Sequence, residues 1–175
     1  MSKILSSISL LILIAAGCQS NSSRPGTPLP YSLGGVLFAD DFSGDLSNWL
    51  AEGGRPQIRD GRMEIDTPLG STVWFKPLLS GNVLIEYDVT VVSNGGPNDR
   101  VSDLNCFWMA TDPAHPENFF AASDQRAGVF ENYDSLSLYY VGYGGNGNTT
   151  TRFRRSGGQN QESKCKDQKC GIASR

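Results

Sequence analysis

Histidine, cysteine and clustered basic residues are all scarce in this sequence. The 175 residues include one histidine, His115, and four cysteines. A structural zinc ion takes four ligands, and Cys165 and Cys170 would need two more, so we do not expect zinc. The 15 basic residues against 18 acidic ones form no basic stripe, which argues against nucleic acid as the main partner. His115 lies alone in a Pro-rich loop, and we expect it to be a surface residue.

Long hydrophobic and helical patterns are also missing. No long segment has helical periodicity, and the apolar run at residues 8–16 is too short to span a membrane. This run follows Lys3 and precedes the small Gly17, which is the pattern of a secretory signal. Residues 14–18 (IAAGC) look like a bacterial lipoprotein box, in which Cys18 becomes the lipidated N-terminus. The alternative is an ordinary cleaved signal followed by a chance cysteine.

The lipoprotein pattern predicts an exported protein that a lipid on Cys18 anchors in the cell envelope, at the outer membrane or in the periplasm. After the signal at 1–17, residues 18–35 are rich in Ser, Asn, Pro and Gly and are typical of a flexible tether. Residues 36–155 carry the folded domain. Residues 156–175 contain almost no large apolar side chain, so we expect a disordered polar tail there.

The end of the chain leaves two interpretations open. A β-sandwich whose last clear strand is at Arg152 and Phe153 lacks its closing strands, which indicates a truncated or frameshifted product. The alternative is a natural polar tail closed by a disulfide between Cys165 and Cys170, because an exported compartment permits disulfides. Cys106 then remains as a buried thiol.

Short alternating segments separated by turn residues dominate the rest of the chain. Glycine is frequent, at 20 residues, and Asp60-Gly61 between alternating residues is a strong hairpin signal. The pattern predicts an all-β sandwich or jelly roll. The main expected strands are at residues 36–38, 72–75, 82–92, 99–110, 136–143 and 149–155. Residues 142–147 match G-x-G-x-x-G but precede a Thr-rich strand, so we expect a hairpin turn and no phosphate site.

The strand expected at 99–110 is the most informative of these. Alternate side chains of a strand point to opposite faces. The face expected to join the core carries Ser102, Leu104, Cys106, Trp108 and Ala110. The face expected to form a binding surface carries Val101, Asp103, Asn105, Phe107 and Met109. An alternative is that Asp103 and Asn105 only satisfy nearby backbone groups.

Glu86 and Asp88 form a candidate catalytic pair for glycoside hydrolysis. They are two residues apart on one expected strand face, roughly 6–7 Å from each other, and paired carboxylates perform this chemistry. The arrangement is similar to the E-x-D core of laminarinase-type glycosidases, but their third acid is missing here. A solvated strand face is the alternative.

A second candidate site combines tyrosine, arginine and asparagine and is suited to a polysaccharide lyase. Arginine or asparagine can neutralise the carboxylate of a uronic acid, and tyrosine can act as the base. The catalytic candidates are Tyr139 and Tyr143, with Tyr140 between them in sequence. The candidate substrate-binding residues are Arg100, Asp103, Asn105, Trp108, Arg152 and Arg154. Alternatively, the tyrosines fill the edge of the core and the arginines belong to a solvated hairpin.

Three stretches carry a resemblance to a known family: residues 38–49 (FADDFSGDLSNW), 99–113 (DRVSDLNCFWMATDP) and 139–155 (YYVGYGGNGNTTTRFRR). They look like an uncharacterised bacterial family of secreted domains. That family is similar to concanavalin A-like lectins and glucanases and is met beside pectin and rhamnogalacturonan degradation enzymes. The resemblance covers about residues 36–155. It implies a concanavalin A-like jelly roll with a concave sugar-binding face, and it does not supply catalytic residues.

From these patterns we expect an envelope lipoprotein that acts on or binds an acidic polysaccharide such as rhamnogalacturonan. As an enzyme it would be a polysaccharide lyase or a glycoside hydrolase. A non-catalytic carbohydrate-binding module and a structural envelope lipoprotein are the alternatives. We expect a monomer without a cofactor. The sequence leaves open whether calcium binds near Asp99 and Asp103. Its partners would be the polysaccharide and, through the lipid anchor, a membrane.

Overall fold

The computed structural model describes residues 13–18, 32–157, 162–163 and 172–173, and this part of the chain is mostly β. Its strands are β1 (Leu13–Cys18), β2 (Gly34–Phe38), β3 (Trp49–Glu52), β4 (Gln57–Ile58), β5 (Met63–Glu64), β6 (Thr72–Phe75), β7 (Leu84–Glu86), β8 (Leu104–Thr111), β9 (Ser137–Gly144), β10 (Thr150–Gly157), β11 (Glu162–Ser163) and β12 (Ile172–Ala173). Its helical segments are the short η1 (Phe119–Ala122), α1 (Ser123–Arg126), η2 (Phe130–Tyr133) and α2 (Gly145–Asn148).

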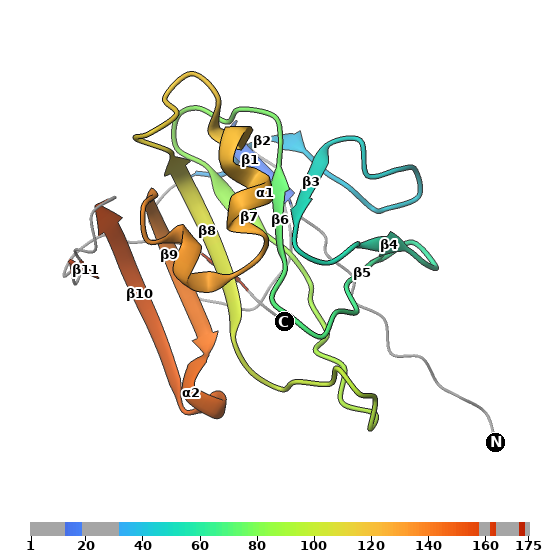
Figure 1. Cartoon of the computed structure of the whole chain (residues 1–175). Coiled ribbons are helices and arrows are strands. Elements are labelled where there is room, and N and C mark those ends of the chain that lie inside the picture. Colours follow the sequence, from blue (N-terminus) through green and yellow to red (C-terminus); the bar gives the residue numbers. More distant parts are fainter. Residues whose placement is uncertain (1–12, 19–31, 158–161, 164–171, 174–175) are drawn as a thin grey trace.

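The strands form several small sheets (Figure 1). One sheet has the order β12-β7-β1-β2 and another the order β11-β10-β9-β8, while β3 pairs with β6 and β4 with β5. All of these pairs are antiparallel except β7 with β12. The mostly β prediction is confirmed at this level. A jelly roll is not evident among the described residues, because the strand expected at 82–92 pairs only over Leu84–Glu86.

Two aromatic-rich clusters form the core. Trp74, Tyr133, Leu136, Leu138 and Tyr140 make the first, which lies between the β8–β10 sheet and the short helices. Phe42, Trp49 and Met63 make the second, near the β4–β5 hairpin. The carboxylate of Asp40 accepts hydrogen bonds of 2.8 Å from the Phe42 N–H and the Trp49 indole N–H. These bonds fix the segment that carries both aromatic anchors.

The central strand differs from its sequence pattern at both ends. β8 begins at Leu104, because Asp103 has a positive φ of 60° that ends the extended conformation. A β-bulge follows Trp108, and Met109 there has a φ of 51° and is 73% exposed. A bulge re-aims the residues after it, so Ala110 packs against the first core cluster on the same side as Phe107. The expected assignment of Phe107 to a binding surface and of Ala110 to the opposite face is therefore wrong.

The turns predicted from glycine are confirmed. Asp60 and Gly61 have φ values of 50° and 65°, and the backbones of Arg59 and Arg62 exchange hydrogen bonds across them. Gly144 also has a positive φ, of 70°, and leads into α2, which joins β9 to β10.

The N-terminal predictions are only partly within the described residues. The predicted signal overlaps β1, which pairs with β2 and β7. Residues 1–12, most of the predicted tether and most of the predicted tail, including Cys165 and Cys170, lie outside the described residues. In the part of the chain that the structure describes, no helix has the length and apolar character needed to cross a membrane.

Candidate functional site

The β8–β10 sheet presents two chemically different faces, which its register defines. Residues paired directly across antiparallel strands point to the same face. One row pairs Asn105 with Gly142 and Gly142 with Arg152, and the next pairs Phe107 with Tyr140 and Tyr140 with Arg154. We call the face with these two rows the arginine face. Its Tyr140 belongs to the first core cluster and its Phe107 packs against that cluster, whereas its Arg152 is exposed. The opposite face, which carries Trp108, Tyr139 and Phe153, we call the tryptophan face.

Gly142 lies at the centre of the arginine face, with Asn105 and Arg152 on either side. Gly142 has no side chain, and a Cβ placed there would be 3.0 Å from Oδ1 of Asn105 and 3.6 Å from the ring of Tyr140. Arg152 is exposed on the other side of Gly142. The Asn105 amide, whose Nδ2 donates to the Asp103 carbonyl at 3.5 Å, thus packs close to Gly142. The exposed Arg152 guanidinium beside them can donate hydrogen bonds to an acid.

The neighbouring row adds Arg154, which is hydrogen-bonded to Tyr140, and aromatic rings. Nη1 of Arg154 donates a 2.7 Å hydrogen bond to the Tyr140 hydroxyl, and its guanidinium lies 5.7 Å from the centre of the Tyr140 ring. Phe130 of η2 packs edge-on against Tyr140, with ring centres 5.9 Å apart, and remains 43% exposed. In Figure 1 this helical segment lies in front of β9. Phe130 therefore gives the arginine face an exposed aromatic edge, which the sequence reasoning missed.

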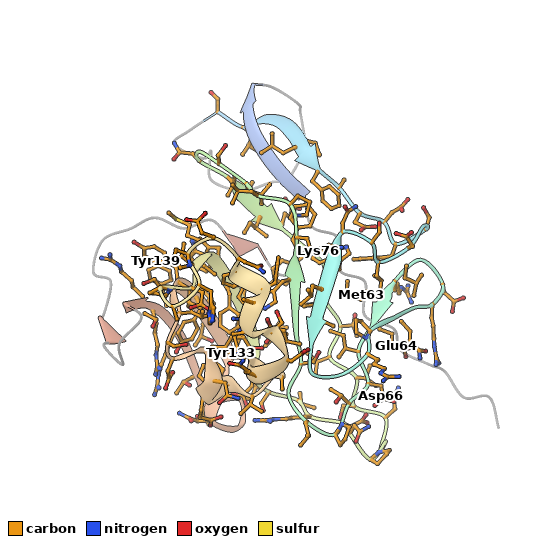
Figure 2. The ribbon with its side chains drawn as sticks, turned by 45° about the horizontal axis from the view of Figure 1, so that its top comes forward. Met63, Glu64, Asp66, Lys76, Tyr133 and Tyr139 are labelled. Atoms are coloured by element: carbon orange, nitrogen blue, oxygen red, sulfur yellow. The ribbon has the colours of Figure 1, made fainter. Side chains whose placement is uncertain are left out.

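Three predicted site residues lie on the tryptophan face instead. Trp108 and Tyr139 stack with Phe153 at ring-centre distances of 5.6–6.1 Å. Tyr143 pairs with Leu104 on the same face and is exposed. Figure 2 labels Tyr139 at the side of the molecule that carries this sheet, and Tyr133 beside the short helices. The sheet therefore separates Trp108, Tyr139 and Tyr143 from Asn105, Arg152 and Arg154, and the predicted set does not form one site.

Cys106 also belongs to the tryptophan face and is a free thiol. Burial raises the pKa of the Cys106 thiol to about 11, against the opposing effect of a hydrogen bond with Tyr87. Burial likewise raises the pKa of Tyr87, and Cys106 adds to that shift. Both groups are protonated at neutral pH, so Cys106 is a packing residue rather than a nucleophile.

Arg100 and Asp103 lie at the start of β8, beside the β9–β10 turn. Arg100 and Ser102 both donate hydrogen bonds to the Asp103 carboxylate, and the Asp103 N–H donates to the Gly144 carbonyl at 3.2 Å. The Asp99 carboxylate accepts from backbone N–H groups of its own turn, at Asn94 and Gly96. The described residues contain no group of three metal-binding side chains. These acids therefore order their own turns.

Glu86 and Asp88 are in a different sheet from the arginines. Glu86 ends β7 and pairs with Leu13 of β1, and the exposed Asp88 follows two residues later. Tyr87, between them, contacts Cys106 on the tryptophan face. The structure thus does not bring this pair to the arginine face.

A buried ion cluster, which the sequence reasoning also missed, holds the segment that carries Phe130. Nη2 of Arg126 donates to the Glu52 carboxylate at 2.6 Å, with the two side chains 3% and 0% exposed. The Tyr133 hydroxyl donates to the same carboxylate at 2.7 Å, and Nη1 of Arg126 lies 3.4 Å from Asp112. Glu52 and Arg126 are 74 positions apart, and no local pattern pairs them.

Both acids of the ion cluster are ionised at neutral pH. Burial acts to raise the pKa of Glu52, but the hydrogen bonds from Arg126 and Tyr133 outweigh it and hold that pKa below its ordinary 4.5. The pKa of Asp112 is likewise below 3.8, because His115, the Ala114 N–H and Arg126 together outweigh burial. A lowered pKa means that the carboxylate stabilises the fold above its ordinary pKa, and that this stabilisation is lost as the pH falls through the lowered value.

His115 closes this cluster at the surface. Its Nδ1 lies 3.0 Å from Oδ2 of Asp112, and its side chain is 40% exposed. His115 is therefore half at the surface, as expected, but it is hydrogen-bonded to a buried acid rather than free in solvent.

Comparison with known proteins places the chain in a family. A family model described as Domain of unknown function (DUF6250) matches residues 65–171. This range includes the whole β8–β10 sheet and the three helical segments before β9, but not residues 38–49. No curated protein and no solved structure matches the chain, and nothing in the family match connects it with pectin degradation or with a concanavalin A-like fold. Because the match spans more than half of its residues, the chain belongs to the family Domain of unknown function (DUF6250).

Proposed function

We propose that this protein binds an acidic polysaccharide, such as rhamnogalacturonan, on the arginine face of the β8–β10 sheet. The observation that carries the proposal is the row in which Asn105 and Arg152 flank Gly142. A uronate carboxylate accepts hydrogen bonds from both an amide and a guanidinium, and the charged pair is the stronger of the two.

The aromatic neighbours support a sugar rather than a simple anion. Phe130 is exposed beside Tyr140, whose hydroxyl already accepts a hydrogen bond from Arg154. An exposed ring next to charged hydrogen-bond donors offers an apolar surface for the faces of sugar rings and polar groups for their substituents. The arginine face supplies the charged donor, Arg152, and Phe130 of η2, packed against Tyr140, supplies the exposed ring.

Replacing Arg152 tests the proposal, and β10 supplies a matched control. Arg152→Ala should weaken binding to rhamnogalacturonan and homogalacturonan about tenfold or more, since hydrogen bonds to charged groups contribute about 1.5–3 kcal/mol. Arg155→Ala removes the same charge from the opposite face of the same strand, where Arg155 lies over the Tyr139 ring, and should change affinity less than about twofold. Affinity electrophoresis and calorimetry measure both.

A neutral galactan serves as the ligand control. Equal losses from the two variants would mean that net charge, and not the arginine face, governs binding. Binding of galactan as tight as that of the acidic polymers would contradict a carboxylate-recognising site.

The glycoside-hydrolase alternative has less support. It would use Glu86 and Asp88, which lie in the β7 sheet away from the arginine face. A concanavalin A-like jelly roll would bring further strands to these sheets, and it remains a proposal that rests on the resemblance of residues 36–155.

We also propose that the protein is exported and anchored in the cell envelope through a lipid on Cys18. The support is the apolar run at residues 8–16 followed by Gly17 and Cys18. Cys18→Ser should abolish incorporation of a labelled fatty acid and shift the protein from the membrane fraction to the soluble fraction. An unchanged membrane fraction and unchanged labelling would refute the anchor, and Cys106→Ser, which removes a cysteine within the sheet, is the control.

A further inference from the structure

Phe130, the exposed ring of the proposed binding site, lies on a short segment that one carboxylate holds at both ends. Arg126 precedes Phe130 by four residues and Tyr133 follows it by three. Nε and Nη2 of Arg126 donate hydrogen bonds to the Glu52 carboxylate at 2.6–3.1 Å. The Tyr133 hydroxyl donates to Oε2 of the same carboxylate at 2.7 Å. Glu52 therefore fixes the chain on each side of Phe130, through side chains that are all buried.

The carboxylate is itself carried by a regular element. Glu52 is the last residue of β3 and pairs with Thr72 of β6, and a side chain on a strand is held more exactly than one on a loop. Gly128, between the two held ends, packs directly on the carbonyl groups of Glu52 and Gly70. η2 has only four residues, and helices this short are not stable in water by themselves. The position of η2 therefore depends on these contacts with β3.

We propose that Glu52 is a positioning residue of the polysaccharide site, which places the Phe130 ring where the face of a sugar ring can stack on it. This inference rests on the proposed binding of an acidic polysaccharide and names the residue that controls the aromatic part of that site. Glu52 does not touch the ligand, because its side chain is 0% exposed. Its effect on binding passes through Phe130, whereas Arg152 lies on a different element, β10.

A ring that is already held in its bound position favours binding. A side chain that a ligand must first immobilise lowers affinity, because its freedom is lost when the ligand binds. Phe130 packs edge-on against Tyr140, with ring centres 5.9 Å apart, and 43% of it stays exposed. Release of the segment from Glu52 would let the ring leave this position. Binding should then weaken although Arg152 is unchanged.

Tyr133→Phe tests the inference without breaking the ion pair. It removes the hydroxyl that bonds Glu52 and keeps the ring in the first core cluster. By calorimetry on folded protein, the affinity for homogalacturonan should fall at least about threefold in Tyr133→Phe and in Glu52→Gln, and at least about fivefold in Phe130→Ala. Tyr87→Phe is the matched control, because the Tyr87 hydroxyl is also buried but bonds Cys106. This control should change the affinity less than about 1.5-fold.

A double-mutant cycle separates positioning from a general loss of structure. In a Phe130→Ala background, Tyr133→Phe and Glu52→Gln should change the affinity less than about 1.5-fold, because the ring that they position is absent. Equal effects in both backgrounds would show that Glu52 only stabilises the fold, and would overturn the inference. If Glu52→Gln does not fold, Tyr133→Phe alone decides.

The remaining outcomes distinguish this inference from the proposed function. Unchanged affinity of Phe130→Ala, or a loss in Tyr87→Phe as large as that in Tyr133→Phe, overturns the positioning role. The proposed function then still stands if Arg152→Ala weakens binding. Absence of wild-type binding to any acidic polysaccharide refutes the proposed function itself.

Discussion

Arg126→Met should destabilise the protein by about 3–5 kcal/mol, because breaking a buried ion pair leaves a charge without its partner in a low-dielectric site. The Glu52 carboxylate, with 0% of its side chain exposed, would keep only the Tyr133 hydroxyl of the donors described above. Asp112 would lose its nearest guanidinium at the same time. The loss is measured by urea denaturation, as a lower midpoint with an unchanged slope.

A surface arginine gives the matched comparison. Arg59 pairs with Glu64 at 3.0 Å, but its side chain is 52% exposed, so Arg59→Met should change stability by about 0–1 kcal/mol. Adding Glu52→Gln to Arg126→Met should restore part of the lost stability, because it removes the unpaired charge. Equal effects of Arg126→Met and Arg59→Met would show that the ion cluster is hydrated in solution.

Gly128→Ala should be strongly destabilising because the new methyl group has no room. Its Cβ would lie 2.4 Å from the Gly70 carbonyl oxygen and 2.6 Å from that of Glu52. Both contacts are with backbone, which cannot rotate away as a side chain can. Gly128 also has a φ of 74°, which costs an alanine roughly 1–2 kcal/mol by itself. We expect a total loss of at least about 3 kcal/mol in the same denaturation experiment.

Gly147 separates the two causes. It has a similar φ of 67°, but nothing lies within 4 Å of a Cβ placed there. Gly147→Ala should therefore show only the conformational effect, roughly 1–2 kcal/mol. If the two alanine variants were equally stable, the close approach of residues 52, 70 and 128 would be absent in solution.

Local patterns predicted the strands and turns well. Thr72–Phe75 was expected as a strand and is β6, and the Asp60-Gly61 turn joins β4 to β5. β9 and β10 lie within one or two residues of the tyrosine and threonine runs that predicted them. These elements depend on turn chemistry and on residue types that neighbouring positions supply.

The features that local patterns did not predict were the long-range contacts and the irregular backbone. Simple alternation assigned Phe107 to a binding surface, but which face of β8 meets the core depends on Trp74 and Tyr133, far away in the sequence. The bulge at Met109 then shifts which side chains of β8 face the core, and no residue type in the sequence predicts this bulge. The candidate site changed for the same reason. Adjacent tyrosines in one strand must face opposite ways, so only the register could show that Tyr139 and Tyr140 lie on different faces.

From its sequence separation, we expect the salt bridge between Glu52 and Arg126 to form late in folding. It closes a loop of 74 positions, and contacts between distant residues slow folding, because chain entropy is lost before they form. Phe130 begins η2, four residues after Arg126 ends α1. During synthesis β3 emerges long before Arg126, so Glu52 stays hydrated until its partner arrives. We therefore expect Phe130, the aromatic edge of the arginine face, to reach its place late in folding.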